Sequence, residues 1–486
     1  MASEKNRNGT LGSLAPRTLF CVGLVLSIQA AVSFAQQAPD ADAHNVRLVG
    51  YHDLQGRESL QVMAVTDTDG DWVYVGHSDN YWGRPQHVNP ITGHEEWNGT
   101  SILNVSDPAN PKLVWHIPND AKANSRSVTV VYNYEHDGSG KDYLARSSQG
   151  EDFFKFQIFD ITSRGTDPSE IMLIAEITGT PKDSCGPGCG GDYITRAHKG
   201  WWSPETGLYY VAAREPGFRS ALMQIWDLRD PKNPKFVSRA WLPGQKDGEP
   251  GWEKQYVHHP IVDEANNRVY AGFRQGSGHA AAFDISDIAN PKVAWAVDTS
   301  PPGRGPHTVS PILYETVPNF GPDALPRTYA FITDEASARP DSKPCLNPVR
   351  TKAYMFDITH ESHPFPVSTW QVPVGNFCEV GGRFGPHQHA ETRNGALNRF
   401  EDKLAWIAYF NAGIRVLDLS DAYNLKEVGH YLPETNENSH PLFEGQPIAI
   451  QINDVDLDRR GLAYVSDRIG TGLFILEYTG DRPTSN

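Results

Sequence analysis

Basic residues, long apolar runs and helical periodicity are all scarce in this chain of 486 residues. Lys+Arg number 43 against 59 Asp+Glu, which gives a formal net charge of −16. Because proteins bind phosphate backbones through Lys and Arg, this balance argues against a nucleic-acid partner. No stretch after residue 35 is apolar enough to span a bilayer. The composition therefore excludes a membrane channel, a coiled coil and a disordered chain.

The one long apolar run covers residues 19–34 and follows a basic segment. It is interrupted, is shorter than the ~20 residues that a bilayer requires, and ends in a small-x-small pattern before residue 36. This pattern predicts a signal peptide, residues 1–35, rather than a membrane anchor. We expect an exported protein, periplasmic or extracellular, that is not inserted in the membrane after cleavage.

Cysteine is also rare, with five residues in the chain. Cys21 would leave with the signal peptide, and the remaining four are an even number in an oxidising compartment, which predicts two disulfides. The expected pairs are Cys185 with Cys189, in a glycine-rich loop, and Cys345 with Cys378. A thiolate metal site is the alternative, although the chain lacks the paired CxxC spacing of such sites.

Glycine and proline are abundant, with 43 and 36 residues, as in a chain with many tight turns. One phrase recurs about every 60 residues: an apolar run, an acidic or amide residue, a turn, and a second apolar run. The residues before the turn are Asn104, Asp160, Asp227, Asp284, Asp357, Asp418 and Glu477. Such a side chain can accept a hydrogen bond from the backbone that follows it and start the turn.

Two further strand-like runs precede each copy, so the repeat predicts four strands per unit. Seven such units predict an all-β fold, a seven-bladed β-propeller. The last copy lacks its fourth strand, and residues 46–52 resemble the missing one; we expect this N-terminal strand to complete the last blade. The predicted divisions are a signal peptide (1–35), a short linker (36–44), the propeller (45–480) and a tail (481–486).

The repeated phrases, such as DISDIANPKVAWAV at residues 284–297, resemble those of the LVIVD-repeat family of secreted bacterial propellers. The resemblance covers nearly all of the chain after residue 35. It implies the architecture but no reaction, because that family is defined by its repeat. A more distant similarity is to selenium-binding-protein-like propellers, some of which resemble metal-dependent oxidases.

Histidine recurs where the innermost strand of a repeat begins. Aligning the copies on a tyrosine of the second strand places these residues there: His198, His259, His307, His387 or His389, and Asn453 in the last copy. Innermost strands line the central channel of a propeller, so these side chains are expected to converge. Imidazole ligands suit Zn, Cu or Fe, and a transition metal is the predicted cofactor.

Strand alternation refines this prediction. His258 and His259 are neighbours and should point to opposite faces, and the register favours His259 as the residue inside the channel. His387 and His389 are two residues apart and should share a face. The competing interpretation is that these histidines are a structural lining, hydrogen-bonded to backbone and water.

Other polar residues lie near the predicted histidine positions. Glu391 and Asp454 are candidate catalytic residues, as a base or as carboxylates that orient a ligand. Arginines close to the histidines, together with the amide of the last copy, are candidates for binding an anionic substrate: Arg196, Arg304, Arg383 and Asn453.

Three functional hypotheses follow. The first is a metal-dependent enzyme acting on a small organic substrate, by oxidation or by metal-activated water. The second is a non-catalytic propeller that binds a peptide, glycan or protein through rim loops such as residues 81–97. A calcium-dependent lactonase or hydrolase is less favoured, because few oxygen ligands are expected at the axis. The sequence leaves the metal, the substrate and the oligomeric state open.

Overall fold

The computed structural model describes residues 36–78, 86–121, 123–149, 154–179, 196–251, 256–274, 278–299, 305–315, 325–335, 351–391 and 403–483. Gln36–Asn486 form one compact unit. The predicted signal peptide, Cys185, Cys189 and Cys345 lie outside the described residues, whereas Cys378 is disulfide-bonded. Among the described residues, no helix combines the length and apolarity needed to cross a membrane.

Five separate four-stranded antiparallel sheets follow one another along the chain, each with its inner strand first in sequence. They are β3 (Ser59–Asp67), β4 (Gly70–His77), β7 (Thr100–Asn104) and β8 (Lys112–Ile117); β9 (Val128–Tyr134), β10 (Lys141–Gln149), β11 (Phe154–Asp160) and β12 (Met172–Gly179); β13 (Arg196–Trp202), β14 (Leu208–Arg214), β15 (Leu222–Asp227) and β16 (Lys235–Ala240); β17 (Tyr256–Asp263), β18 (Arg268–Arg274), β19 (His279–Asp284) and β20 (Lys292–Asp298); and β21 (Pro306–Tyr314), β22 (Arg327–Asp334), β23 (Ala353–Asp357) and β24 (Phe365–Trp370).

A larger sheet contains the two ends of the described chain. It is made of β25 (Phe384–His389), β26 (Leu404–Phe410), β27 (Ile414–Asp418), β28 (Lys426–Pro433) and β1 (Ala41–His44), joined to β29 (Ile452–Leu457), β30 (Leu462–Asp467), β31 (Leu473–Tyr478) and β2 (Val46–His52). A single residue pair, Phe410 with Ile452, connects the two runs.

The N-terminal closure predicted from the sequence is confirmed, because β2 pairs antiparallel with β31. The segment expected to be a linker instead contains β1, which adds a further strand to the edge of β28. Shorter elements are the hairpin of β5 (His87–Val88) and β6 (Glu95–Glu96) and the 3-10 helices η1 (Leu54–Gly56), η2 (Thr162–Gly165), η3 (Pro168–Glu170) and η4 (Glu264–Asn266).

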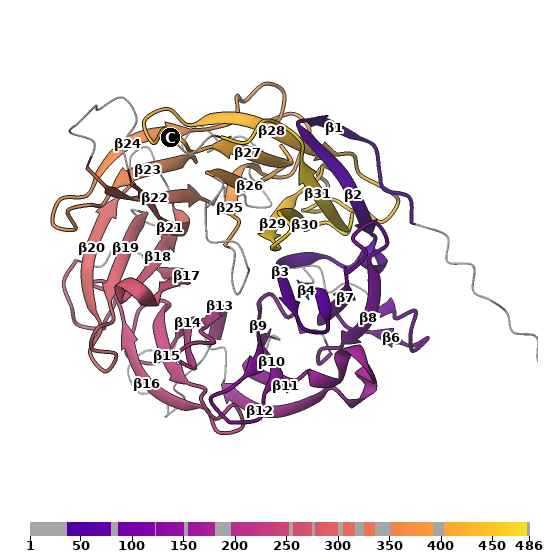
Figure 1. Ribbon diagram of the computed structural model, residues 1–486, viewed down its shortest axis with the longest axis horizontal. Helices are drawn as coiled ribbons and strands as arrows, with labels where there is room; N and C mark the ends of the chain where they lie inside the picture. Colours follow the sequence, from indigo (N-terminus) through magenta and orange to yellow (C-terminus); the bar gives the residue numbers. More distant parts are fainter. Residues whose placement is uncertain are drawn as a thin grey trace, which may run out of the picture. The chain divides into compact units, whose positions relative to one another are not determined.

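The sheets are arranged as a propeller, which confirms the predicted fold class (Figure 1). The innermost strands contact one another in a closed circle, in the order β3, β9, β13, β17, β21, β25 and β29. The number of seven blades stays a prediction, because two runs of strands belong to one nine-stranded sheet. Apolar side chains such as Ile225, Phe283 and Val309 fill the space between neighbouring sheets.

The recurring residue before each turn does what the repeat predicts. Its side-chain Oδ1 accepts a hydrogen bond from the backbone N–H two residues later, and this holds for Asn104, Asp160, Asp227, Asp284, Asp357 and Asp418. The bond fixes the chain in a turn between the third and fourth strands of the sheet.

All the innermost strands except β9 share an irregularity at the end where the histidines occur. The pairing register shifts between Ala197 and Gly200 in β13, and between Val257 and Pro260 in β17. Comparable shifts occur in β3, β21, β25 and β29. A β-bulge inserts an extra residue and re-aims side chains, so simple alternation does not hold at these positions.

Candidate metal centre

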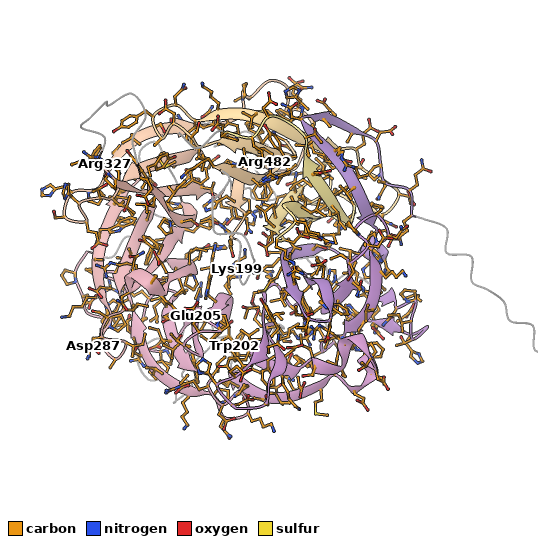
Figure 2. All side chains as sticks on the ribbon, viewed as in Figure 1. Lys199, Trp202, Glu205, Asp287, Arg327 and Arg482 are labelled. Atoms are coloured by element: carbon orange, nitrogen blue, oxygen red, sulfur yellow. The ribbon has the colours of Figure 1, made fainter. Side chains whose placement is uncertain are left out.

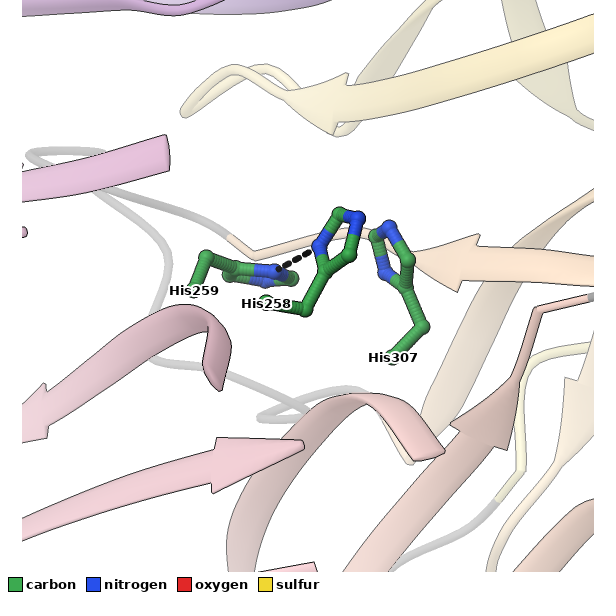
Figure 3. Close-up of side chains that lie close together, drawn as sticks. All are labelled: His258, His259 and His307. Carbon is green, nitrogen blue, oxygen red and sulfur yellow. Dashed lines mark hydrogen bonds between the residues drawn. The ribbon is translucent and has the colours of Figure 1, made fainter. Parts of the chain in front are cut away.

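Three histidines from two neighbouring inner strands converge in the channel. His258 and His259 come from the bulge of β17, and His307 comes from the bulge of β21 (Figure 3). The Nδ1 atoms of His258 and His259 are 3.2 Å apart, and each of the three residues offers a nitrogen within 4.8 Å of the others. All three side chains are buried. The expectation that only His259 enters the channel is wrong, because the bulge turns both residues inward.

Two further histidines extend this group on either side. His198 Nε2 lies 3.0 Å from His258 Nε2. On the other side the ring of His387, from β25, has its centroid 4.2 Å from that of His307. His307, His387 and the carboxylate of Glu335 form a second set of donors within 4.8 Å of one another. The structure therefore brings together His198, His259, His307 and His387, four of the five predicted ligands.

A partner outside the group lies close to the second nitrogen of three rings, and two of these contacts are hydrogen bonds. His259 Nε2 lies 2.7 Å from Glu391, and His387 Nδ1 donates to the backbone oxygen of Asn453. His307 Nδ1 lies 2.9 Å from the Thr308 hydroxyl. The two hydrogen bonds direct the opposite nitrogens of His307 and His387 toward the group, as outer partners of metal-bound histidines do.

The donor set fits a transition metal. His307 Nε2 is buried and has no hydrogen-bond partner within the described part of the chain, an arrangement that an ion would satisfy. The 3.2 Å between the His258 and His259 nitrogens is close to the ~3.3 Å between two nitrogens in a tetrahedral site with bonds of about 2.0 Å. Nitrogen donors of this kind favour Zn, Cu or Fe over Ca or Mg.

Three of the channel imidazoles have pKa values that favour the neutral form. Burial lowers the pKa of His258, His307 and His387 well below 6.5, and neighbouring cationic groups lower it further. Lys199 acts on all three pKa values, and Arg383 acts on that of His387. Neutral imidazole is the form that binds a metal ion, so the apoprotein needs little deprotonation before binding.

Glu335 links the histidines to two arginines. Its carboxylate lies 3.6 Å from His258 Nε2, 2.8 Å from Arg274 and 3.0 Å from Arg383. The Arg383 guanidinium also lies over the ring of Phe410, which is next to His387. Arg383 is thus placed beside the centre, as predicted, although its ion pair with Glu335 was not foreseen.

Lys199 extends from β13 to residues of β25 and β29. It follows His198 in the bulge of β13, and Figure 2 shows it near the middle of the ring of sheets. Its ammonium contacts Gln388 Oε1 and lies 3.6 Å from Glu391 and 3.7 Å from Asp454. The side chain is only 1% exposed.

The predicted carboxylates occupy different places around this lysine. Glu391 touches His259, whereas Asp454 accepts hydrogen bonds from the amides of Val62 and Val455. Burial raises the pKa of Asp454 to about 7, although Lys199 opposes this shift. Asp456, two residues further on, has a pKa raised to about 8 by burial.

Other predicted site residues are elsewhere. His389 does not join the group: its nitrogens lie 2.8 Å from Ser310 and 3.2 Å from Thr333, because the register of β25 shifts just before it. Asn453 is buried, and its side-chain amide donates to the Leu60 carbonyl while its backbone oxygen accepts from His387. Arg304 and the side chain of Arg196 lie outside the described residues.

The alignment on tyrosines missed Lys199 and His258 because it matched Tyr209 with Tyr270, whereas the strand pairing makes Tyr210 the counterpart of Tyr270. Arg196 pairs with Arg214 as Tyr256 pairs with Arg274. This register makes His198 the structural equivalent of His258, and Lys199 that of His259. The adjacent polar pairs His198-Lys199 and His258-His259 were the sequence signal that could have revealed this equivalence.

A cleft of about 1020 Å³ lies away from the histidines, at the opposite ends of β13 and β17. Trp201, Val262 and Tyr270 are among its lining residues, and Glu205, Glu264 and Glu361 contribute carboxylates. It contains none of the candidate metal ligands.

No family model and no curated protein matches the chain. Among solved structures, a chain of the mitotic checkpoint complex is similar at 10% identity and a TM-score of 0.46, covering 93% of this chain and 100% of that one. Sqt1 from Chaetomium thermophilum is similar at 8% identity and a TM-score of 0.48, with 89% and 99% covered. The periplasmic gluconolactonase PpgL of Pseudomonas aeruginosa is similar at 10% identity and a TM-score of 0.45, with 84% and 99% covered. At these values the similarities say nothing about function.

Proposed function

We propose that the protein is a metal-dependent enzyme whose single transition-metal ion is held by the channel histidines. The observation that carries this proposal is the convergence of buried nitrogens from His258, His259 and His307. His387 and Glu335 are placed to complete the ligand set. Because the Nδ1 of His307 faces Thr308, only its Nε2 remains, so the two overlapping donor sets serve one ion.

The chemistry proposed is oxidation of a small organic substrate, or attack by water activated on the ion. A Zn, Cu or Fe ion would supply Lewis acidity or a redox couple, and the chain supplies neutral imidazoles and a buried, charged surrounding. His198 and Arg274 are less buried than the other members of the group and mark the side from which a substrate would approach. The more distant similarity of the repeats to selenium-binding-protein-like propellers supports this choice only as an analogy.

The test is metal binding by purified, metal-stripped protein titrated separately with Zn(II) and Cu(II). The wild type should bind one equivalent, and His259→Ala should bind at least ~100-fold more weakly, since even outer partners of ligands are worth 10–100-fold. His389→Ala is the matched control, because His389 is buried and hydrogen-bonded outside the group. Equal binding by wild type and His259→Ala would contradict the proposal.

A binding or scaffolding propeller is the second candidate. It is favoured by the β5–β6 hairpin, which exposes the apolar side chains of Val88 and Ile91. Exposed apolar residues on a rim loop are typical of a recognition surface. If this candidate is correct, Val88→Ser together with Ile91→Ser should abolish partner binding, and the histidine variants should not affect it.

A further inference from the structure

The cleft at the opposite ends of β13 and β17 plays no part in the proposed metal centre. Three neighbouring sheets form it: Ser203 and Glu205 follow β13, Glu264 begins η4 after β17, and Leu313 belongs to β21. Its volume of about 1020 Å³ is at the upper end of the ~300–1,000 Å³ that small-molecule pockets occupy. The cleft therefore has room for a ligand larger than a single side chain.

Apolar side chains form part of the cleft wall. Trp201, Val262, Tyr270 and Ile358 are buried residues that contribute to its lining. Leu313 also lines the cleft and is 52% exposed, although most residues of β21 are buried. A ligand that covered this leucine would remove apolar surface from water, which favours binding.

The cleft is also negatively charged. The carboxylates of Glu205, Asp263, Glu264 and Glu361 line it, against one guanidinium, that of Arg268. Arg268 is already held by Glu361, with its Nε 2.7 Å from Oε1 and its Nη2 2.9 Å from Oε2. Within the described part of the chain, Glu205, Asp263 and Glu264 form no ion pair. Three carboxylates thus remain for a cationic ligand.

Two of these carboxylates are held in place by neutral groups. The hydroxyls of Ser203 and Thr206 donate to the two oxygens of Glu264, each over 2.7 Å. The side-chain amide of Asn266 donates to Asp263 over 2.9 Å. Because the donors are uncharged, the negative charge is kept while the side chains are fixed. A cation therefore binds without the cost of ordering these two acceptors.

Lysine and arginine side chains match both properties of the cleft. Each carries a cation on an apolar stem, and the guanidinium of arginine can bind a carboxylate through two hydrogen bonds. A metal ion fits less well, because neither group of potential metal ligands found among the described residues includes a carboxylate of this cleft. A nucleic acid would be repelled by the carboxylates.

We propose that this cleft is a docking site for a segment of a partner protein in which basic residues stand next to apolar ones. The basic side chains would contact Glu205, Asp263 and Glu264, and an apolar side chain would cover Leu313. The inference does not depend on the proposed function, since none of the candidate metal ligands lines the cleft.

Fluorescence anisotropy with a labelled peptide of alternating arginine and leucine tests the inference. The wild type should bind this peptide. The double variant Glu205→Gln, Glu264→Gln should bind it about 10-fold more weakly, as expected for the loss of two charged contacts at an accessible site. Leu313→Ser should bind it about 5-fold more weakly, because less apolar surface is covered.

The variants are chosen to preserve the fold. Glutamine at position 264 keeps an acceptor for the Ser203 and Thr206 hydroxyls, and Leu313 is exposed. Glu170→Gln is the matched control, because Glu170 is also an exposed glutamate in a 3-10 helix but belongs to the second sheet. This variant should bind the peptide as the wild type does. Circular dichroism confirms folding before the titrations.

Comparison ligands identify the occupant. A peptide with glycine in place of leucine should bind at least ~5-fold more weakly, because it leaves the apolar wall uncovered. A peptide of alternating glutamate and leucine should not bind, because like charges repel. Spermine, a small polycation, should not displace the arginine–leucine peptide when the two are present at equal concentration.

The inference is overturned if the wild type does not bind the arginine–leucine peptide at ~1 mM, the range of the weakest specific complexes. It is also overturned if the double glutamine variant binds as tightly as the wild type. Equal binding of the glycine peptide, or displacement by spermine, would contradict it as well, since the cleft would then attract any polycation.

Discussion

Two groups of buried histidines in this molecule differ in what their nitrogens face. In the first sheet, His77 Nε2 and His116 Nδ1 lie 2.8 and 3.1 Å from the hydroxyl of Ser101. Their other nitrogens face the backbone carbonyls of Glu58 and Trp97. In the channel, by contrast, His258 and His307 face other imidazoles.

Burial and pKa do not distinguish the two groups. The pKa values of His77 and His116 lie well below 6.5 because of burial, as do those of His258 and His307. Oxygen atoms of the protein satisfy the first pair, whereas the channel group leaves donor nitrogens directed at a common point. Hydrogen-bond partners, rather than histidine content, therefore mark the candidate metal centre.

The largest effect is expected when one histidine of each group is replaced. His307→Ala should lower the affinity for Zn(II) by more than ~100-fold, because it removes the nitrogen shared by both donor sets. His116→Ala should leave that affinity unchanged. Competition with a chromophoric chelator measures both, and equal losses would remove the distinction between the two groups.

The second expected effect concerns stability. His116→Ala should lower the free energy of unfolding of the metal-free protein by about 2 kcal/mol, because Ser101 and the Trp97 carbonyl lose their buried partner. Urea unfolding of the metal-free proteins measures this value. His307→Ala should cost less, because the Nε2 of His307 has no hydrogen-bond partner among the described residues. The reverse order would show that the channel histidines are mainly structural.

A third prediction concerns the buried carboxylate of Asp456 in the inner strand β29. The pKa of Asp456 is raised from 3.8 to about 8, so the native state keeps a proton that the unfolded chain loses. Stability from this group is present at low pH and is lost as the pH rises from about 4 through about 8. Between pH 5 and 8 the wild type should lose at least ~1 kcal/mol more than Asp456→Asn, by urea unfolding at each pH. If the unfolding free energies of the wild type and Asp456→Asn changed in parallel with pH, the pKa of Asp456 would not be raised, and this carboxylate would lie in a more polar environment.

The smallest effect is expected at a repeat turn. Asp284→Ala removes the hydrogen bond from the Ser286 amide to the Asp284 carboxylate, at the exposed edge of the fourth sheet. The expected cost is about 0.5–1 kcal/mol in the same unfolding assay, with metal affinity unchanged. A larger loss, or any change in metal affinity, would mean that the turns influence the channel.

The fold was predictable because the same strand-and-turn pattern recurs along the sequence. The turn residues, such as Asp284 and Asp357, recur at matching places and make the same hydrogen bond. The missing fourth strand of the last copy predicted that residues 46–52 would pair with β31. The strand β1 was not predicted, because a short pairing at the edge of a sheet leaves no repeat signal.

The site was only partly predictable. The sequence identified the histidine-bearing ends of the inner strands, and His198, His259, His307 and His387 do meet there. It assigned His258 and His389 incorrectly, since a bulge reverses the facing that alternation predicts. Glu335 follows β22 and contacts His258 of β17, and Lys199 of β13 lies close to Glu391, which follows β25; such contacts depend on tertiary packing.

The most direct test of this account is the metal content of the wild-type protein, purified from an exporting host and measured by inductively coupled plasma mass spectrometry with X-ray absorption of any bound metal. The account predicts one Zn, Cu or Fe ion per chain with nitrogen ligands at about 2.0 Å. Folded protein that carries no stoichiometric metal, and takes up none when titrated, would contradict it.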